Sequence, residues 1–522
     1  MTSPDVAWGA FTDVGPWTVV PSDLSWRDGI DELRARTRLE APALTRAGVL
    51  PPLGRVARTG VRFGAALGQW TVLDRLGGAE GATAALSARL RSAFESLGPT
   101  YVKLGQIVST GSGVFPPDMV AEFAHCRDDV PPESFRSVRR TIERELGGPV
   151  DETFESIDER PLAAGSVAQV YAARLHSGQD VVVKVLRRGI GALVRDDLAT
   201  MAWMVRHVVG RLRVARLANP KAVLEVFAET ILEELDLRLE ADNMLDVARA
   251  LGESVDRRVL VPRPHPELVT RRVLVMERME GFAFDDASSV RAAAITPELL
   301  RGAVVSFVEA VFAHGVFHGD LHGGNLRIRP DGRIALLDHG ITGRFDDTGR
   351  RAFTRLLLTA AMGDLSGQLE AVRDLGALPP DTDLDALAVD LGLDVGLPDV
   401  ADLDQRELAD HLQALAASLL DHGARLPKAV VLLVKDVLFL DSAIALHAPE
   451  IDLFAEAVAV LEDLIASRGD ELAVELGVAP DALQVDLAGL RHMFGLSDME
   501  QLPYEELCRR RDLLRDRLTS RP

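Results

Sequence analysis

A change of hydrophobic period near residue 167 separates parts of the chain with different secondary structure. Apolar residues recur at helical spacing over 83–144, whereas 167–175 alternates and 180–186 is a short apolar run, Asp-Val-Val-Val-Lys-Val-Leu. These patterns predict two strands, and Gly178 between them predicts the turn of a β-hairpin. The chain is therefore expected to combine a small sheet with many helices, and Lys184 lies on the second strand.

Later segments repeat this mixture of elements. Residues 194–217 and 222–251 predict long helices, 272–277 a strand, and 297–314 a helix that leads into a polar loop. A second hairpin, 326–328 and 334–337, is predicted to turn at Pro330-Asp331-Gly332, and only helices are expected after residue 347. The order predicts an α+β fold with a helical N-terminal extension and a helical C-terminal region. The expected divisions are 1–82, 83–150, 151–280, 281–445 and 446–522.

Composition limits the function classes. The 522 residues carry 58 basic and 79 acidic side chains, a net charge of −21, which argues against nucleic acid as a partner. Two distant cysteines and no basic-then-apolar leader favour the cytoplasm. The most apolar window, 429–446, is interrupted by Lys435, Asp436 and Asp441 and is interpreted as a buried helix rather than a membrane span.

The segment His318-Gly-Asp320-Leu-His322-Gly-Gly-Asn325 has the spacing of a phosphoryl-transfer loop. Asp320 would orient or deprotonate the acceptor, and Asn325 would bind Mg²⁺ from the same loop. Asp338-His-Gly follows the second hairpin, where kinases place their magnesium-binding aspartate. Asp338 is therefore the second predicted metal ligand.

Lys184 and Glu240 are the predicted ion pair behind the nucleotide phosphates. A lysine on an apolar strand needs a partner, because an unpaired buried ammonium is costly. Glu240 lies on a predicted helix that carries rival carboxylates, which leaves the pairing open. Glu277 and Met279 lie at the end of the predicted strand 272–277. Their backbone groups are expected to form hydrogen bonds with the adenine base of the nucleotide.

Three features typical of protein kinases are missing from the sequence. No Gly-x-Gly-x-x-Gly precedes Lys184, and Gly319 stands where many kinases have an arginine before the catalytic aspartate. No Ala-Pro-Glu segment follows Asp338 before helices resume. The motifs therefore predict an atypical site rather than a site for protein substrates.

Together these residues resemble the UbiB/AarF family of atypical kinases. The family's Lys-x-Gly-Gln motif is similar to Lys103-Leu-Gly-Gln106, and its Glu-x-Asp motif to Glu234-Leu-Asp236. The resemblance implies that Lys103 and Gln106 face the nucleotide. It also implies a nucleotide loop that matches the alanine-rich segment, with the contacts Ala163, Ala164, Gly165, Ser166 and Val167.

The resemblance implies a two-lobed protein-kinase-like fold, with 151–280 as the N-lobe and 281–445 as the C-lobe. It also implies an ATP- and Mg²⁺-dependent kinase or ATPase in isoprenoid-quinone or other lipid metabolism, with an acceptor left open between a small molecule and a lipid. Two alternatives stay open: a small-molecule phosphotransferase of the aminoglycoside or choline kinase type, and a nucleotide-sensing scaffold without phosphotransfer. The first shares the His-Gly-Asp-Leu-His-x-Gly-Asn loop.

The N-terminal region offers a surface of opposite charge to the rest. Residues 33–62 hold seven arginines and one acid, Glu40. A solvated basic face and a surface for anionic lipid are both open interpretations, so the expected location is cytoplasmic, with peripheral contact at the inner face of the membrane as one alternative. The preceding irregular segment contains Trp8, Trp17 and Trp26 and is expected to pack on the body as a docked arm.

Overall fold

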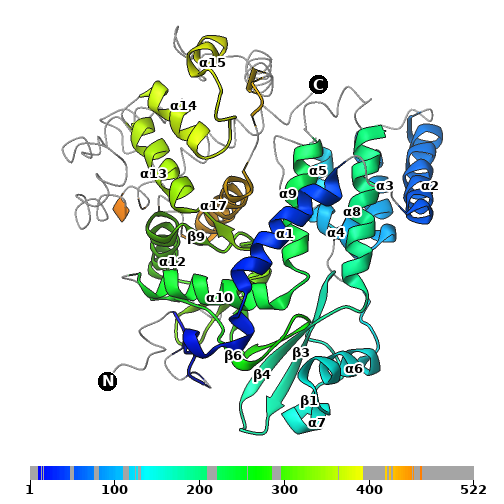
Figure 1. Cartoon of the computed structure of the whole chain (residues 1–522), viewed down its shortest axis with the longest axis vertical. Coiled ribbons are helices and arrows are strands. Elements are labelled where there is room, and N and C mark those ends of the chain that lie inside the picture. The colour runs from blue at the N-terminus through cyan, green and yellow to red at the C-terminus, as the bar shows by residue number, and fades with distance from the viewer. Residues whose placement is uncertain are drawn as a thin grey trace.

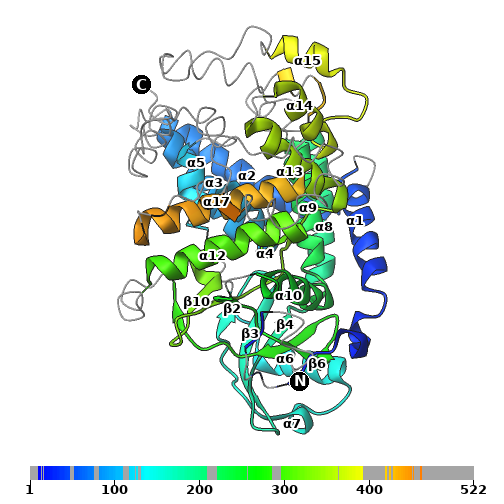
Figure 2. The same cartoon turned by 90° about the vertical axis from the view of Figure 1, so that its left-hand side faces the viewer.

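The structure is a computed structural model of the chain. It describes residues 10–12, 15, 17–46, 52–75, 82–109, 117–123, 125–126, 131–207, 220–254, 257–284, 295–361, 364–391, 418–419, 422–424, 427–448, 451, 456 and 459–460. Trp8 and nearly all of the predicted 446–522 region lie outside these residues. Figures 1 and 2 show a sheet-bearing end, a central layer of helices and a helical end.

The sheet at the first end is antiparallel. Its strand order is β1-β3-β4-β7-β6, and β2 pairs with β3. The strands are β1 (Phe154–Ile157), β2 (Ala163–Ala164), β3 (Ala168–Leu175), β4 (Asp180–Leu186), β6 (Pro264–Val269) and β7 (Val273–Glu277). Strands β3, β4 and β7 correspond to the predicted strands 167–175, 180–186 and 272–277, whereas β1, β2 and β6 were not predicted.

The faces of β4 differ in their surroundings. Val181, Val183 and Val185 are buried in an apolar cluster with the short helices α6 (Phe135–Leu146) and α7 (Val150–Thr153) nearby. Because successive side chains alternate across a strand, Lys184 points to the opposite face. That face turns toward helix α10 (Leu237–Gly252) and is where the candidate site lies.

A second sheet supports residues 318–325, the predicted catalytic loop. It has the order β5-β11-β10-β8, with β5 (Val259–Leu260), β8 (Phe282–Ala283), β10 (Leu326–Ile328) and β11 (Ile334–Leu336). The hairpin β10–β11 agrees with its predicted position. A two-stranded sheet joins β9 (Val316–Phe317) to β12 (Gly343–Arg344), and so brackets the loop between them.

The predicted single helix over 222–251 is wrong, because the chain breaks at Glu234-Leu-Asp236. Helix α9 (Pro220–Glu233) ends there and α10 begins at Leu237. Asp236 is the N-cap of α10, and its carboxylate accepts the Arg238 N–H at 3.2 Å. An acidic N-cap satisfies a helix-terminal donor and favours a new helix start. The break places Glu234 at the mouth of the site, instead of on a continuous helix face.

The N-terminal helices pack beside α8 (Ile190–His207) and α9, on the right of Figure 1. They are α1 (Ile30–Thr45), α2 (Leu53–Gln69), α3 (Ala82–Leu97), α4 (Pro99–Ser109) and α5 (Pro117–Phe123). A break between α3 and α4 was not predicted. It falls at Gly98, whose φ of +112° is a conformation that other residues resist.

The remaining helices are α12 (Pro297–Glu309) with the π-helical turn Ala310–His314, then α13 (Asp347–Ala361), α14 (Leu365–Asp374), α15 (Leu384–Asp390) and α17 (Lys428–His447). Of these, α13, α14 and α15 lie at the end of the molecule away from the first sheet, and α12 and α17 lie across its middle (Figure 2). Helix α17 crosses the molecule next to α12. Among the described residues no helix combines the length and the apolar character needed to cross a membrane.

Candidate active site

A cavity of about 360 Å³ lies between the first sheet, α4, α10 and the segment after β11. Its walls include, among others, Lys103, Ala163, Ala164, Gly165, Ser166, Val167, Lys184, Glu234, Glu240 and Asp338. The structure thus brings together nine of the predicted site residues and Glu234. Arg187 holds the alanine-rich loop in place by donating from Nε to the Gly165 carbonyl at 2.9 Å.

Lys184 joins the two acidic groups predicted around it. Its Nζ donates to Glu240 Oε1 at 2.7 Å and to Asp338 Oδ1 at 2.9 Å. Burial acts to lower the pKa of Lys184, but the charges of Asp338 and Glu240 outweigh it and hold the pKa above its ordinary value. Lys184 is therefore a fixed cation that faces the cavity.

Glu240 is almost completely buried on α10, with 4% of its side chain exposed. Burial raises its pKa to about 7, and the attraction of Lys184 offsets only part of that effect. Asp338 is half exposed toward the cavity, and Lys184 outweighs burial to lower its pKa. The three groups make a site in which one carboxylate anchors the lysine and the other faces the cavity.

Lys103 closes one side of the cavity from helix α4. Its Nζ lies 3.1 Å from Glu234 Oε1, at the break between α9 and α10. Burial raises the pKa of Glu234, and Lys103 opposes that rise. Gln106, one turn further along α4, is half-buried but is not one of the cavity residues. The structure therefore brings Lys103 to the predicted nucleotide site without Gln106.

The catalytic loop has a partner that the sequence analysis missed, the pair Lys435 and Asp436 on α17. Lys435 forms an ion pair with the Asp320 carboxylate. Asp436 is fully buried and accepts the N–H groups of Gly319 at 2.8 Å and Leu321 at 2.9 Å, on either side of Asp320. Two adjacent charged residues inside a largely apolar helix were the available signal, because buried charges need partners.

These contacts also affect ionisation in the loop. Burial would raise the pKa of Asp320, but Lys435 and other nearby cations lower it to about 2. Asp320 is thus a carboxylate throughout the physiological range. Gly319 has a φ of +79°, and a Cβ there would come within 2.9 Å of the Gly343 nitrogen. The close approach of β12 explains why glycine stands before Asp320.

Hydrogen bonds connect the loop with the Asp338 segment. His318, which is buried, contacts the Leu337 carbonyl through Nε2 at 2.9 Å. Asn325 donates from Nδ2 to the Asp320 carbonyl at 3.0 Å. Asp338 has a φ of +56°, a left-handed conformation that is uncommon for a non-glycine residue and is found at functional sites. The loop and Asp338 are therefore held in one fixed relation.

The predicted hinge residues lie at the edge of this arrangement. The Glu277 carboxylate accepts a hydrogen bond from the Thr12 hydroxyl at 2.6 Å, and its backbone N–H donates to the Arg263 carbonyl at 2.8 Å. The Met279 sulfur contacts Arg329 at 3.7 Å. Neither Glu277 nor Met279 is among the residues that line the cavity.

The donor set near Asp338 fits magnesium in the way kinases use it. No three histidine, cysteine, aspartate or glutamate side chains in the described ranges are placed to hold a metal by themselves. Mg²⁺ takes oxygen ligands and commonly uses one or two protein groups together with phosphate oxygens. Asp338 offers a carboxylate, and Asn325 offers its amide oxygen because its nitrogen already donates to the loop. Both residues have the oxygen ligands that a metal arriving with a nucleotide needs, but only Asp338 is among the residues that line the cavity.

Comparisons with known proteins relate the chain to kinase-like proteins. The ABC1 atypical kinase-like domain matches residues 125–372. An uncharacterised protein of Mycobacterium tuberculosis is 34% identical over 380 residues, which cover 70% of this chain and 76% of that protein. A probable protein kinase UbiB of Aliivibrio fischeri is 31% identical over 390 residues, covering 73% and 71%.

The chain belongs to this ABC1, or UbiB/AarF, family of kinase-like proteins. A chloroplastic aarF domain-containing protein kinase of Arabidopsis thaliana is also similar, at 32% identity over 400 residues covering 70% of this chain and 73% of that protein. The family assignment shows a kinase-like α+β fold, as the sequence predicted. A Mycobacterium tuberculosis protein solved with erythromycin aligns at 22% identity and a TM-score of 0.37, covering 63% of this chain and 89% of that one. So distant a likeness says nothing about ligands.

Proposed function

We propose that the protein binds ATP with Mg²⁺ in the cavity and transfers or hydrolyses the terminal phosphoryl group. The observation that carries the proposal is Lys184, which contacts Glu240 and Asp338 at once beneath the alanine-rich loop. Phosphoryl transfer depends on positioning and on charge stabilisation, and a lysine fixed between two carboxylates supplies both. Bound magnesium would neutralise charge on the phosphate oxygens.

Each residue would have a separate task. Glu240 would hold Lys184 in position to contact the nucleotide phosphates. Backbone groups of residues 163–167 would contact the same phosphates from the alanine-rich loop. Asp338 and Asn325 would take the metal. Asp320 would orient the attacking hydroxyl or water, with its carboxylate steadied by Lys435.

A small acceptor or water suits this cavity better than a folded protein. Lys103 and Glu234 close the side that α4 covers, and both are largely buried. The family's link with isoprenoid-quinone metabolism supports a lipid acceptor, and the relatives named UbiB support the same direction. The proposal is therefore an atypical kinase or ATPase of lipid metabolism.

ATP turnover by the purified protein, with and without lipid extract, tests the proposal. Asp338→Asn removes the metal-facing carboxylate and is expected to reduce turnover by roughly two orders of magnitude. Asp331→Asn is the matched control, because Asp331 lies in the exposed turn of the neighbouring hairpin. Equal turnover by Asp338→Asn and Asp331→Asn, with both folded, would refute the metal assignment. A labelled product found only with lipid would identify a kinase rather than an ATPase.

We further infer that α2 contacts anionic membrane lipid. Arg58 and Arg62 are exposed on this helix beside the exposed apolar residues Leu53 and Val61, and basic and apolar groups on one helix suit a membrane interface. Co-sedimentation with phosphatidylserine vesicles should fall when Arg58 and Arg62 are both changed to glutamine. Equal sedimentation of the variant and the wild type would refute this inference.

A further inference from the structure

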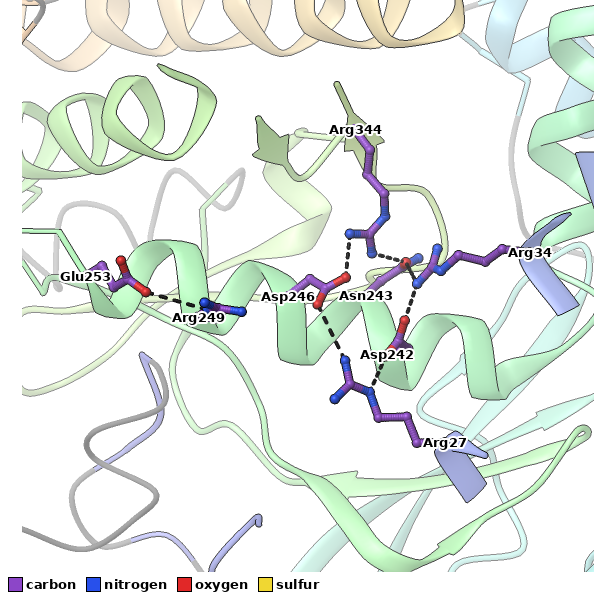
Figure 3. Close-up of polar contacts among 8 residues, drawn as sticks. All are labelled: Arg27, Arg34, Asp242, Asn243, Asp246, Arg249, Glu253 and Arg344. Carbon is purple, nitrogen blue, oxygen red and sulfur yellow. Dashed lines mark hydrogen bonds and ion pairs between the residues drawn. The ribbon is translucent and has the colours of Figure 1, made fainter. Parts of the chain in front are cut away.

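Helix α10 is held on its outer side by arginines from the start of the chain (Figure 3). Arg27, at the end of the short turn Ser25–Arg27, donates to Asp242 Oδ1 at 2.8 Å and lies 3.9 Å from Asp246. Arg34 of α1 donates to Asp242 Oδ2 at 2.5 Å and to Asn243 Oδ1 at 2.9 Å. The side chain of Asp242 is only 3% exposed, so these charged contacts are shielded from water.

The same helix carries Glu240 on its inner side. With about 100° of rotation per residue, Asp242 and Asp246 lie roughly 200° and 240° around the axis from Glu240. Lys184 therefore holds one side of α10, while Arg27 and Arg34 hold the opposite side. A rotation or shift of the helix that broke the Lys184–Glu240 pair would also have to break the arginine contacts.

Asn243 connects this outer contact to the metal-facing segment. Its Nδ2 donates to the His339 carbonyl at 2.8 Å, directly after Asp338. Its Oδ1 accepts from Arg34 and also from Arg344 Nη2, at 2.7 Å, and Arg344 pairs with Asp246 as well. One buried amide thus joins α1, α10 and both ends of the segment 339–344.

The arm before α1 contacts α10 and the hinge at separate points. The Ala10 N–H donates to the Ala248 carbonyl on α10 at 2.7 Å, and the Ala10 carbonyl accepts the Val261 N–H at 3.0 Å. Thr12 donates to Glu277 at the end of β7. These contacts repeat, independently of the arginines, the attachment of the chain's start to the elements around the nucleotide cavity.

We propose that residues 10–12 and 17–34 form a built-in positioning element for α10, with Arg34 as its central residue. Through Asp242 and Asn243, Arg34 fixes the helix so that Glu240 meets Lys184 and the backbone beside Asp338 keeps its place. In kinases the position of the corresponding helix controls whether the lysine–glutamate pair is formed. The inference rests on the proposed binding of Mg-ATP, and Arg34 acts through Glu240 without touching the nucleotide.

Two measurements on the full chain test this role. The first is hydrogen–deuterium exchange of the protein without nucleotide, in which Arg34→Gln should speed exchange in α10 and in 338–344. The second is Mg-ATP affinity, which Arg34→Gln should weaken by at least about fivefold, the lower end of usual coupling between sites. Arg36→Gln is the matched control, because Arg36 is an exposed arginine on the same helix. Arg34→Lys, which keeps the charge, should recover part of the loss.

A double-mutant cycle separates positioning from general stability. If Arg34 acts through Glu240, then Arg34→Gln added to Glu240→Gln should cost little further nucleotide affinity. Equal exchange and equal affinity in Arg34→Gln and Arg36→Gln would overturn the inference, as would full additivity with Glu240→Gln. If Arg34→Gln does not fold, Arg27→Gln replaces it in both measurements, because Arg27 is the more exposed arginine. The same exchange and affinity criteria then apply to Arg27→Gln. If the wild type binds no Mg-ATP, the proposed function is refuted. The hydrogen–deuterium exchange of Arg34→Gln and Arg36→Gln would still test whether Arg34 positions α10.

Discussion

Asp436 is expected to determine whether the catalytic loop keeps its shape. Its carboxylate is fully buried, and it is the acceptor for the N–H groups of Gly319 and Leu321. Asp436→Ala would leave both donors buried without that partner, at about 1–3 kcal/mol each, or about 2–6 kcal/mol of unfolding free energy in total. Asp436→Asn keeps one oxygen as an acceptor and should cost about half as much.

Urea unfolding of both variants measures these differences, with ATP turnover followed in parallel. Ser442→Ala is the control, because Ser442 is exposed on the same helix and donates only to the Leu438 carbonyl among the contacts described. Both Asp436 variants should lose turnover even in conditions where they remain folded, since Gly319 and Leu321 flank Asp320. The reasoning fails if Asp436→Ala is no less stable than Asp436→Asn, or if its turnover equals that of Ser442→Ala.

Two further predictions concern ionisation in the site. Because burial raises the pKa of Glu240 from 4.5 to about 7, its contribution to folding stability is complete below pH 4.5 and is lost as pH rises through 7. As the pH rises through 7, Glu240 loses its proton and becomes the carboxylate that pairs with Lys184. Mg-ATP affinity should therefore increase from about pH 6 to 8 in the wild type and not in Glu240→Gln. Lys435→Met should raise the pKa of Asp320 from about 2 and shift the acidic limb of the pH–rate profile to higher pH. Lys428→Met, which removes a lysine that pairs with Glu233 on α9, should leave that limb in place.

The sequence predicted those parts of the site that lie in short, locally patterned segments. Lys184 was found because it interrupts a short apolar strand, and Asp320, Asn325 and Asp338 because a loop and a hairpin keep fixed spacing. Lys103 was identified through the family resemblance alone, because nothing in its own helix distinguishes it from a surface lysine. The roles of these residues stay predictions until the variants are measured.

Contacts between residues far apart in the sequence could not be predicted from local patterns. Lys435 and Asp436 meet the catalytic loop across about 115 residues of chain. Arg34 reaches α10 across 208 residues. The break at Glu234-Leu-Asp236 was missed because leucine and glutamate are good helix formers, and the capping carboxylate of Asp236 was counted as one more helical residue.

The docked N-terminal arm also sets an order of events during synthesis. Arg263 is almost fully buried, and its guanidinium donates to the carbonyls of Thr12 and Trp17. Thr12 and its partner Glu277 are 265 residues apart. At about 5–20 residues per second, the ribosome needs roughly 13 to 50 s to make that stretch. The arm is therefore synthesised well before its binding surface exists, and its residues Val19 and Trp26, which are buried in the folded protein, stay without that cover until then.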